Sequence, residues 1–240
     1  MTDNILKPIL ITGAARSGTS MTAGVFHACG AWGGELAGPT RYNKRGMFEN
    51  AEIRSTIIKP MLKRMNCDPM GQHPLPDLTE IEFTRDDAAK LRENVIGILR
   101  KHGLDNQQWF YKGAKMCLIW PVWNLAFPDA KWIIVRRKPG DIVNSCIRTS
   151  FMRAFGKDPK GWKWWVGEHL QRFQEMKTAG LQIYNVWPQK MIFGDFNEIK
   201  EAIKWAGLNW NDKAVMKFIE PALWTTKMKK KGLNNGKSNE

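Results

Sequence analysis

The chain has 240 residues, of which 43% are hydrophobic and 25% are charged. This size and balance are typical of a soluble globular protein with enough residues for one α/β domain and its core. The formal net charge of +14 favours anionic partners, such as a nucleotide, a sulfated or phosphorylated molecule, nucleic acid or a membrane surface. No recognition module for nucleic acid is present, so we predict no specific nucleic-acid partner.

The four cysteines argue against several kinds of site. Cys29, Cys67, Cys117 and Cys146 are widely spaced and form no C-x-x-C pair, so we predict neither a zinc site nor a redox dithiol, and no bound metal. Such thiols suit a reducing compartment. No charged n-region with an apolar h-region begins the chain, and no run reaches the ~20 apolar residues of a membrane span. These features together predict a cytoplasmic protein.

The first predicted elements form an anion cradle. Pro8–Thr12 is a short apolar run rich in β-branched residues, which predicts a buried parallel strand. The tight turn Gly13–Gly18 follows, and Thr19–Cys29 predicts a helix. In this order the N–H groups of the loop and of the helix start converge on one point, and the helix dipole favours negative charge there. We therefore expect a phosphate or sulfate group at this loop.

The residues of this loop distinguish it from a nucleoside-triphosphate loop, which has the pattern G-x-x-x-x-G-K-[ST]. Gly13, Gly18 and Ser20 match that pattern, but Thr19 stands where the lysine is required, and a cation, Arg16, lies inside the loop instead. The residues predicted to bind the anion are Gly13, Ala15, Arg16, Ser17, Gly18, Thr19 and Ser20.

The middle of the chain alternates between helices and loops. Apolar spacing predicts helices over Asn50–Arg64, with Asn50 as the N-cap, over Asp86–Lys101, and over Met116–Phe127. Residues 66–80 hold three prolines and predict a loop that could cover the site. Gln108–Lys112 predicts a short strand.

A second anion site is predicted further along the chain. Lys131–Val135 predicts a buried strand, and Arg136, Arg137 and Lys138 follow it directly, before a helix that begins near Pro139. Three cations at the carboxyl end of a parallel strand are unfavourable unless an anion lies among them. In open α/β sheets this is also the edge where ligands bind.

The last third predicts a long helix over Gly161–Val186, a strand over Lys190–Phe196 and a helix over Glu198–Ala206. Strands that alternate with helices predict a single α/β domain, residues 1–228, with a central parallel sheet flanked by helices. Residues 229–240 predict a lysine-rich, disordered tail.

Two of these segments carry a resemblance to a known family. Arg16–Ser20 resembles the phosphosulfate-binding loop [RK]-S-G-T-[TS] of the sulfotransferases, a P-loop fold that uses 3′-phosphoadenosine 5′-phosphosulfate (PAPS). Arg137, Pro139, Asp141 and Ser145 resemble the second motif of that family, R-x-P-x-D-x-x-x-S. The resemblance implies that the loop binds the 5′-phosphosulfate end of PAPS, and that Arg137 and Ser145 bind its 3′-phosphate.

Other segments extend the resemblance and limit it. Asn43–Asn50, with its pattern N-x-x-G-x-F-E-N, resembles the microbial and viral branch of the family, including marine phage proteins. Lys112–Lys115 is similar to the family's K-D-P-[RK] segment but lacks the Asp-Pro pair. Met21 stands where the cytosolic enzymes have the tryptophan that stacks on adenine. The ring that stacks on adenine is therefore not identified by the motif.

The resemblance implies a sulfotransferase that moves a sulfuryl group from PAPS to a hydroxyl or amine, releases 3′-phosphoadenosine 5′-phosphate (PAP), and requires no metal. Arg16 would stabilise the leaving group by charge and hydrogen bonds, because arginine does not give up its proton. One of Lys112 and Lys115 would contact the sulfuryl group or the acceptor, and Lys115 is the residue we select as catalytic. Glu49 is the preferred general base, and His73 is the alternative if its loop folds over the site.

Two other functions remain open at this stage. A nucleotide kinase or hydrolase of the P-loop type is disfavoured by Thr19 and by the arginines after strand 131–135, where a magnesium-binding aspartate is expected. A non-catalytic protein that binds polyanions would also explain the charge. For a sulfotransferase, the acceptor classes left open are a small molecule, a glycan and a lipid head group, and the oligomeric state is open too.

Overall fold

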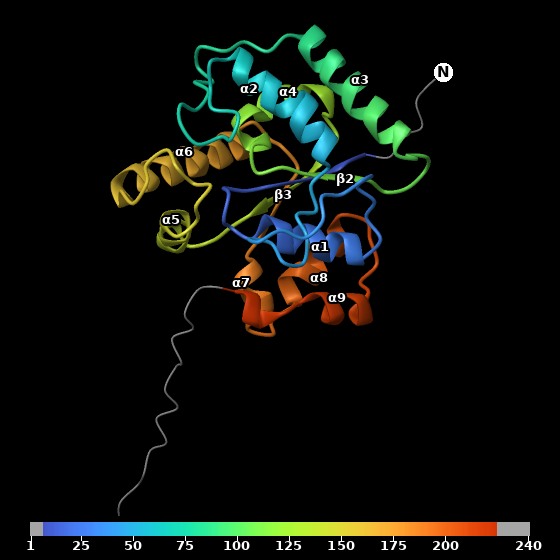
Figure 1. Ribbon diagram of the computed structural model, residues 1–240. Coiled ribbons are helices and arrows are strands. Elements are labelled where there is room, and N and C mark those ends of the chain that lie inside the picture. Colours follow the sequence, from blue (N-terminus) through green and yellow to red (C-terminus); the bar gives the residue numbers. More distant parts are fainter. Residues whose placement is uncertain (1–6, 225–240) are drawn as a thin grey trace, which may run out of the picture.

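The computed structural model describes residues 7–224, and its centre is a parallel sheet of four strands (Figure 1). The strand order is β2-β1-β3-β4, and every neighbouring pair is parallel. The strands are β1 (Ile9–Thr12), β2 (Phe110–Lys112), β3 (Lys131–Val135) and β4 (Ile183–Val186). The predicted α/β fold with a central parallel sheet is confirmed.

Helices cover both faces of the sheet, because successive side chains of its inner strands point to opposite faces. Trp132 and Ile134 of β3 pack into one core, whereas Ile133 and Val135 pack into the other. Figure 1 shows α2, α3 and α4 on one side of the sheet and α1, α8 and α9 on the other.

The helices of the first side are η1 (Ile53–Ile58), α2 (Lys59–Arg64), α3 (Arg85–Lys101), η2 (Met116–Ile119) and α4 (Trp120–Ala126). The helices of the second side are α1 (Thr19–Ala28), α7 (Pro188–Ile192), α8 (Asn197–Trp205) and α9 (Asp212–Phe218). At one end of the sheet, α5 (Pro139–Ile147) packs on α6 (Pro159–Thr178), and the short η3 (Pro221–Leu223) ends the described chain.

The predicted elements before residue 160 are largely confirmed, and two predictions after it are wrong. The helix predicted over Gly161–Val186 ends at Thr178, and its last residues form β4 instead. Gly180, with φ +77°, breaks the helix, and the following residues pair with β3. The strand predicted over Lys190–Phe196 is wrong too, because Pro188 at the helix start favours α7 there.

Helix α9 was not predicted, and it matters for packing on α1. The ring of Phe218 lies where a Cβ on Gly24 would be, with its Cζ 2.0 Å from that position.

All four cysteines are buried thiols. No helix within residues 7–224 is long and apolar enough to cross a membrane. The predicted tail, residues 229–240, lies outside the described residues.

The strand order places three chain segments at one edge of the sheet. β1 lies between β2 and β3, so the chain leaves β1 toward β2 on one side and later adds β3 on the other. Ligands of open α/β sheets bind outside the carboxyl ends of strands at such a switch point. Here that edge carries Gly13–Gly18 after β1, Arg136–Lys138 after β3, and Lys112–Lys115 at the end of β2.

Candidate functional site

The loop after β1 has the predicted strand–loop–helix arrangement. At Gly13 a Cβ would lie 2.7 Å from the carbonyl oxygen of Val135, so a larger residue would push β1 and β3 apart. Gly18 has φ +102°, a conformation that favours glycine, and it directly precedes α1. The first N–H groups of α1 have no partner within the helix and point toward the loop, as an anion cradle requires.

A buried hydroxyl in the loop fits this purpose. Ser17 is fully buried, and its Oγ has no hydrogen-bond partner among the described residues. Its main-chain N–H donates to the carbonyl oxygen of Ala14 at 3.1 Å, which fixes the turn. An unpaired buried hydroxyl is unfavourable by about 1–3 kcal/mol. A phosphate oxygen in the cradle would accept the hydrogen bond that Ser17 does not make within the protein.

The two predicted anion sites contact each other. Arg137 donates a hydrogen bond from Nη1 to the main-chain oxygen of Arg16 at 2.6 Å, and Arg16 donates from Nε to Oγ of Ser145 at 3.2 Å. The contact follows from the sheet, because β1 and β3 are hydrogen-bonded neighbours about 4.8 Å apart. Burial lowers the pKa of both arginines, yet a guanidinium stays charged at neutral pH. Two cations this close favour an anion beside them.

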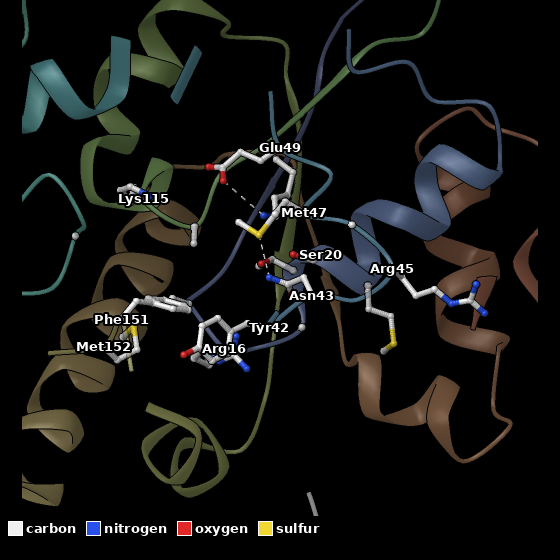
Figure 2. Close-up of a pocket in the computed structure, with 18 of the residues that line it drawn as sticks. Arg16, Ser20, Tyr42, Asn43, Arg45, Met47, Glu49, Lys115, Phe151 and Met152 are labelled. Carbon is white, nitrogen blue, oxygen red and sulfur yellow. Dashed lines mark hydrogen bonds and ion pairs between the residues drawn. The ribbon is translucent and has the colours of Figure 1, made fainter. Parts of the chain in front are cut away.

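A cavity of about 470 Å³ extends from this loop toward the end of β2. Figure 2 shows Glu49 and Lys115 at one end of it, Arg16 and Phe151 at the other, and Ser20 between them. The predicted site residues that line the cavity are Ala15, Arg16, Gly18, Thr19, Ser20, Glu49 and Lys115. The other predicted residues are buried close to the loop and do not line the cavity, namely Gly13, Ser17, Arg137 and Ser145.

Glu49 lies in the cavity wall as an ionised carboxylate. Only 4% of it is exposed, and its Oε2 lies 3.1 Å from Nη1 of Arg54 and 3.9 Å from Nζ of Lys112. Burial by itself would raise the pKa of Glu49, but the charges of Lys112, Lys115 and Arg54 outweigh it and lower the pKa. The carboxylate is therefore charged at neutral pH and available as a proton acceptor.

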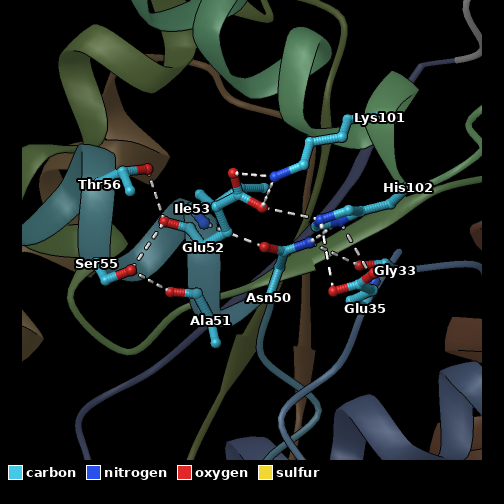
Figure 3. A network of polar contacts seen from close by, with 10 residues as sticks. All are labelled: Gly33, Glu35, Asn50, Ala51, Glu52, Ile53, Ser55, Thr56, Lys101 and His102. Atoms are coloured by element: carbon cyan, nitrogen blue, oxygen red, sulfur yellow. Dashed lines mark hydrogen bonds and ion pairs between the residues drawn. The ribbon is translucent and has the colours of Figure 1, made fainter.

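A polar network holds the residue after Glu49 in place (Figure 3). The Oδ1 of Asn50 accepts a hydrogen bond from the main-chain N–H of Ile53 at 3.1 Å, which confirms the predicted N-cap. The Nδ2 of Asn50 lies 3.1 Å from Nδ1 of His102, whose Nε2 lies 2.9 Å from Oε2 of Glu52. This network ties the start of η1 to the end of α3, and so fixes the backbone that carries Glu49.

His73, the alternative general base, lies away from the cavity, whereas His169 lies in its wall. His73 is exposed, packs against Phe155 and Trp164 with ring centroids 5.4 Å apart in both cases, and does not line the cavity. His169 does line it, and the sequence analysis missed this residue. Its Nδ1 donates to the carbonyl oxygen of Trp165 at 2.8 Å, and burial lowers its pKa to about 4. His169 is thus a neutral imidazole whose Nε2 is an acceptor.

Trp224 is a second residue that the sequence analysis missed. Its ring lies 4.6 Å from the guanidinium carbon of Arg137, and its edge lies 3.3 Å from where a Cβ on Gly18 would be. It also lines the cavity. A flat aromatic ring therefore covers both predicted anion sites from the C-terminal end of the described chain. In the sequence Trp224 is a single tryptophan after Pro221, and nothing in the residues around it indicates that it lies over the anion sites.

The segment before Glu49 closes one side of the cavity. The hydroxyl of Tyr42 hydrogen-bonds to Oγ of Ser150, and the Tyr42 ring stands edge-on to Phe151 with centroids 5.1 Å apart. Arg45 forms an ion pair of 3.2 Å with Glu220 in front of η3. The loop that carries Tyr42 and Arg45 thus bridges the α5–α6 connection and the C-terminal segment.

Within residues 7–224 no group of three or more His, Cys, Asp or Glu side chains could hold a metal ion.

Sequence comparison and structural comparison give different results. No protein-family model and no curated protein matches the chain in sequence. Solved sulfotransferases match it in structure. The sulfotransferase STF9 from Mycobacterium avium superimposes with a TM-score of 0.53 at 13% identity, over 88% of this chain and 66% of that one.

Two further sulfotransferase domains are similar in the same way. The sulfotransferase domain of the Synechococcus PCC 7002 olefin synthase gives a TM-score of 0.50 at 14% identity, over 90% of this chain and 78% of that one. The sulfotransferase domain from the curacin biosynthetic pathway gives 0.54 at 10% identity, over 90% and 79%. At such identities the likeness establishes the fold, and it agrees with the motifs after β1 and β3. The chain therefore has the α/β fold of the bacterial sulfotransferases.

Proposed function

We propose that the chain is a PAPS-dependent sulfotransferase that transfers a sulfuryl group to a hydroxyl or amine of its acceptor. The observation that supports this most strongly is the chain of hydrogen bonds from Arg137 to Arg16 to Ser145. It brings the two predicted anion sites together, as a donor with a phosphate at each end of one ribose requires. A P-loop kinase or hydrolase, the alternative function, binds a nucleotide without a 3′-phosphate, so this contact does not support it.

The donor is bound by the loop after β1, the start of α1, the turn after β3 and α5. The loop N–H groups and the hydroxyls of Ser17, Thr19 and Ser20 hold the 5′-phosphate. Arg137 and Ser145 hold the 3′-phosphate. Because Arg16 donates to Ser145 in the structure, PAPS binding exchanges this hydrogen bond for one to the oxygen between phosphorus and sulfur.

Trp224 is our candidate for the ring that stacks on adenine. It lies against Arg137, where the adenosine attached to the 3′-phosphate must pass, and it lines the cavity. Met21, at the family's tryptophan position, also lines the cavity and offers an apolar side chain but no ring. Stacking of a base on an aromatic side chain contributes about 1–3 kcal/mol.

The reaction is a displacement at sulfur. The acceptor oxygen attacks the sulfur and forms a new S–O bond, while the S–O bond to the 5′-phosphate breaks and leaves its electron pair on the phosphate oxygen of PAP. Arg16 stabilises the charge that develops on this oxygen, and Lys115 contacts the sulfuryl oxygens. Glu49 takes the proton of the acceptor, a contribution of about 10²–10⁴-fold in rate for a general base.

The test is a comparison of adenine nucleotides as ligands. PAP should raise the melting temperature more than AMP or ATP does, and labelled PAPS should pass its label to an acceptor in a screen of hydroxylated compounds. The variant Arg137→Ala should remove the preference for PAP over AMP, whereas Lys138→Ala, at the exposed neighbour, should leave it unchanged. Equal shifts from all three nucleotides would contradict the proposed donor site.

A further inference from the structure

The end of the cavity away from Arg137 is lined by four cationic side chains. They are Arg54 of η1, Lys59 of α2, Lys112 of β2 and Lys115 in front of η2. The aliphatic stem of Lys115 lies close to Gly71, where a Cβ would be 3.0 Å from its Cγ, so its position is set by packing. Figure 2 shows Lys115 on the same side of the cavity as Glu49.

Glu49 compensates only part of this charge. Its Oε2 serves both Arg54 and Lys112, and no other carboxylate lines this end of the described cavity. Neither Lys59 nor Lys115 forms an ion pair within 4 Å with any residue in the described range 7–224. The Nε of Arg54 is buried without a hydrogen-bond partner there. Four cations thus face one carboxylate.

This imbalance is energetically unfavourable in the absence of a further anion. Burial lowers the pKa of Lys112 and of Lys115, and the charge of Glu49 offsets this only in part. A buried cation without full compensation destabilises the folded protein, while a bound anion recovers that free energy. Electrostatic attraction inside such a cavity is several times stronger than in water.

The donor does not provide this anion in full, because of the strand order. The predicted 3′-phosphate site follows β3 and the phosphosulfate cradle follows β1, whereas Lys112 ends β2 on the opposite side of β1. Adjacent strands are about 4.8 Å apart, so the ends of β2 and β3 are about 10 Å apart. The sulfuryl group accounts for one negative charge near Lys115. Lys59 and the Nε of Arg54 remain.

We propose that Lys59 and Arg54 form an oxyanion subsite for the acceptor, and that the acceptor carries a carboxylate, sulfate or phosphate group beside the hydroxyl that is sulfated. This inference rests on the proposed sulfuryl transfer and names the class of its second substrate. The anionic group binds at Lys59 and Arg54, and the acceptor hydroxyl then lies between Glu49 and the sulfuryl group.

The test uses inorganic sulfate as a probe with the full chain saturated by PAP. PAP fills both phosphate sites but carries no sulfuryl group, so a further rise in melting temperature with millimolar sodium sulfate, relative to sodium chloride of equal ionic strength, reports sulfate at the subsite or at the empty sulfuryl position, and the Lys59 variants distinguish the two. In Lys59→Met the apparent affinity for sulfate should fall about tenfold, because one charge-assisted contact to the anion is lost. Lys63→Met, an exposed lysine on the same helix, should behave like the wild type.

Four outcomes decide between these interpretations. Retained sulfate binding in Lys59→Arg together with loss in Lys59→Met supports a charge-based subsite and rules out a general effect on folding. Equal sulfate effects in the wild type, Lys59→Met and Lys63→Met overturn the inference, as does sulfate binding that PAP abolishes. Failure of PAP itself to stabilise the protein would instead overturn the proposed sulfotransferase function.

Discussion

The Nη1 of Arg137 lies 2.6 Å from the main-chain oxygen of Arg16, although 121 positions separate the two residues in the chain. The contact joins the loop after β1 to the turn after β3. Because Arg16 also donates to Ser145, the structure makes one continuous cationic surface of two motifs that are separate in the sequence. The first predictions follow from this surface.

Ser145→Ala should weaken PAP binding and leave AMP binding unchanged. The hydroxyl of Ser145 is predicted to bond to the 3′-phosphate, and a hydrogen bond to a charged group contributes about 1.5–3 kcal/mol, which corresponds to roughly ten- to hundredfold in affinity. Isothermal titration of both nucleotides measures this. Asn144→Ala is a suitable control, because Asn144 is the exposed neighbour of Ser145 on α5 and does not line the cavity. Equal losses for PAP and AMP would exclude a role in 3′-phosphate recognition.

Arg16→Ala should lower kcat by about 10²–10³, the usual loss when one donor to a developing negative charge is removed. The KM for PAPS should change much less, because the loop N–H groups and α1 still hold the 5′-phosphate. Arg16→Lys keeps a charge and should recover part of the rate. Steady-state assays with labelled PAPS separate the two constants. A variant with unchanged kcat and a raised KM would show that Arg16 only binds the donor.

Trp224→Ala should weaken the binding of PAP by about ten- to hundredfold, because a base stacked on an aromatic ring gains about 1–3 kcal/mol. Trp224→Phe preserves a ring and should lose less. Quenching of tryptophan fluorescence by PAP gives an independent readout, since the Trp224→Phe protein should lose part of the signal. Trp164→Ala, at an exposed tryptophan near the start of α6 that does not line the cavity, is the control. Unaltered PAP affinity in Trp224→Ala would assign the stacking elsewhere.

His169 should make the protein less stable in mild acid. Burial lowers its pKa from 6.5 to about 4, so between these values the unfolded chain binds a proton that the folded protein does not. The free energy of unfolding should therefore fall, on the order of 3 kcal/mol from this residue, as the pH drops from about 6.5 to 4.

Chemical denaturation at several pH values measures this dependence. The variant His169→Gln does not titrate and should show a flatter profile over the same range. His73→Gln, at an exposed histidine, should follow the wild type. A profile of His169→Gln as steep as that of the wild type would assign the acid sensitivity to other groups.

Replacing two helical glycines by alanine should change the free energy of unfolding in opposite directions. Gly97 lies on the exposed side of α3 with nothing within 4 Å of a Cβ, so Gly97→Ala should stabilise the protein by about 0.5–1 kcal/mol. At Gly24 of α1 the new Cβ would lie 2.0 Å from the Phe218 ring. Gly24→Ala should therefore destabilise by about 1–3 kcal/mol through overpacking. Urea denaturation measures both, and stabilisation by Gly24→Ala would show that α9 moves freely.

Local sequence patterns were enough to predict the fold class and the positions of the two cationic loops at strand ends. The strand at 131–135 and the strand–loop–helix order around Arg16 depend on apolar runs, glycines and the start of a helix, all of which act over a few residues. The motifs at Arg16 and Arg137 follow from the same kind of local chemistry. These features required no knowledge of which strand lies beside which.

Sequence patterns failed where the outcome depended on a distant partner. Ile183–Val186 forms β4 because its backbone pairs with the open edge of β3. The local pattern of residues around 183–186 contains no information about that distant strand. His169 and Trp224 reach the cavity only through the packing of α6 and of the C-terminal segment. Their neighbours along the chain give no signal of this.

The sequence by itself determined that the chain has an α/β fold with two cationic loops, because helix starts, glycine turns and buried strands are set by short-range sterics and hydrogen bonds. Only the tertiary structure decided that these loops touch, and that Arg54, Lys112 and Lys115 gather beyond them around Glu49. The physical reason is the strand order, since β1 lies between β2 and β3 and so brings three distant segments to one edge of the sheet.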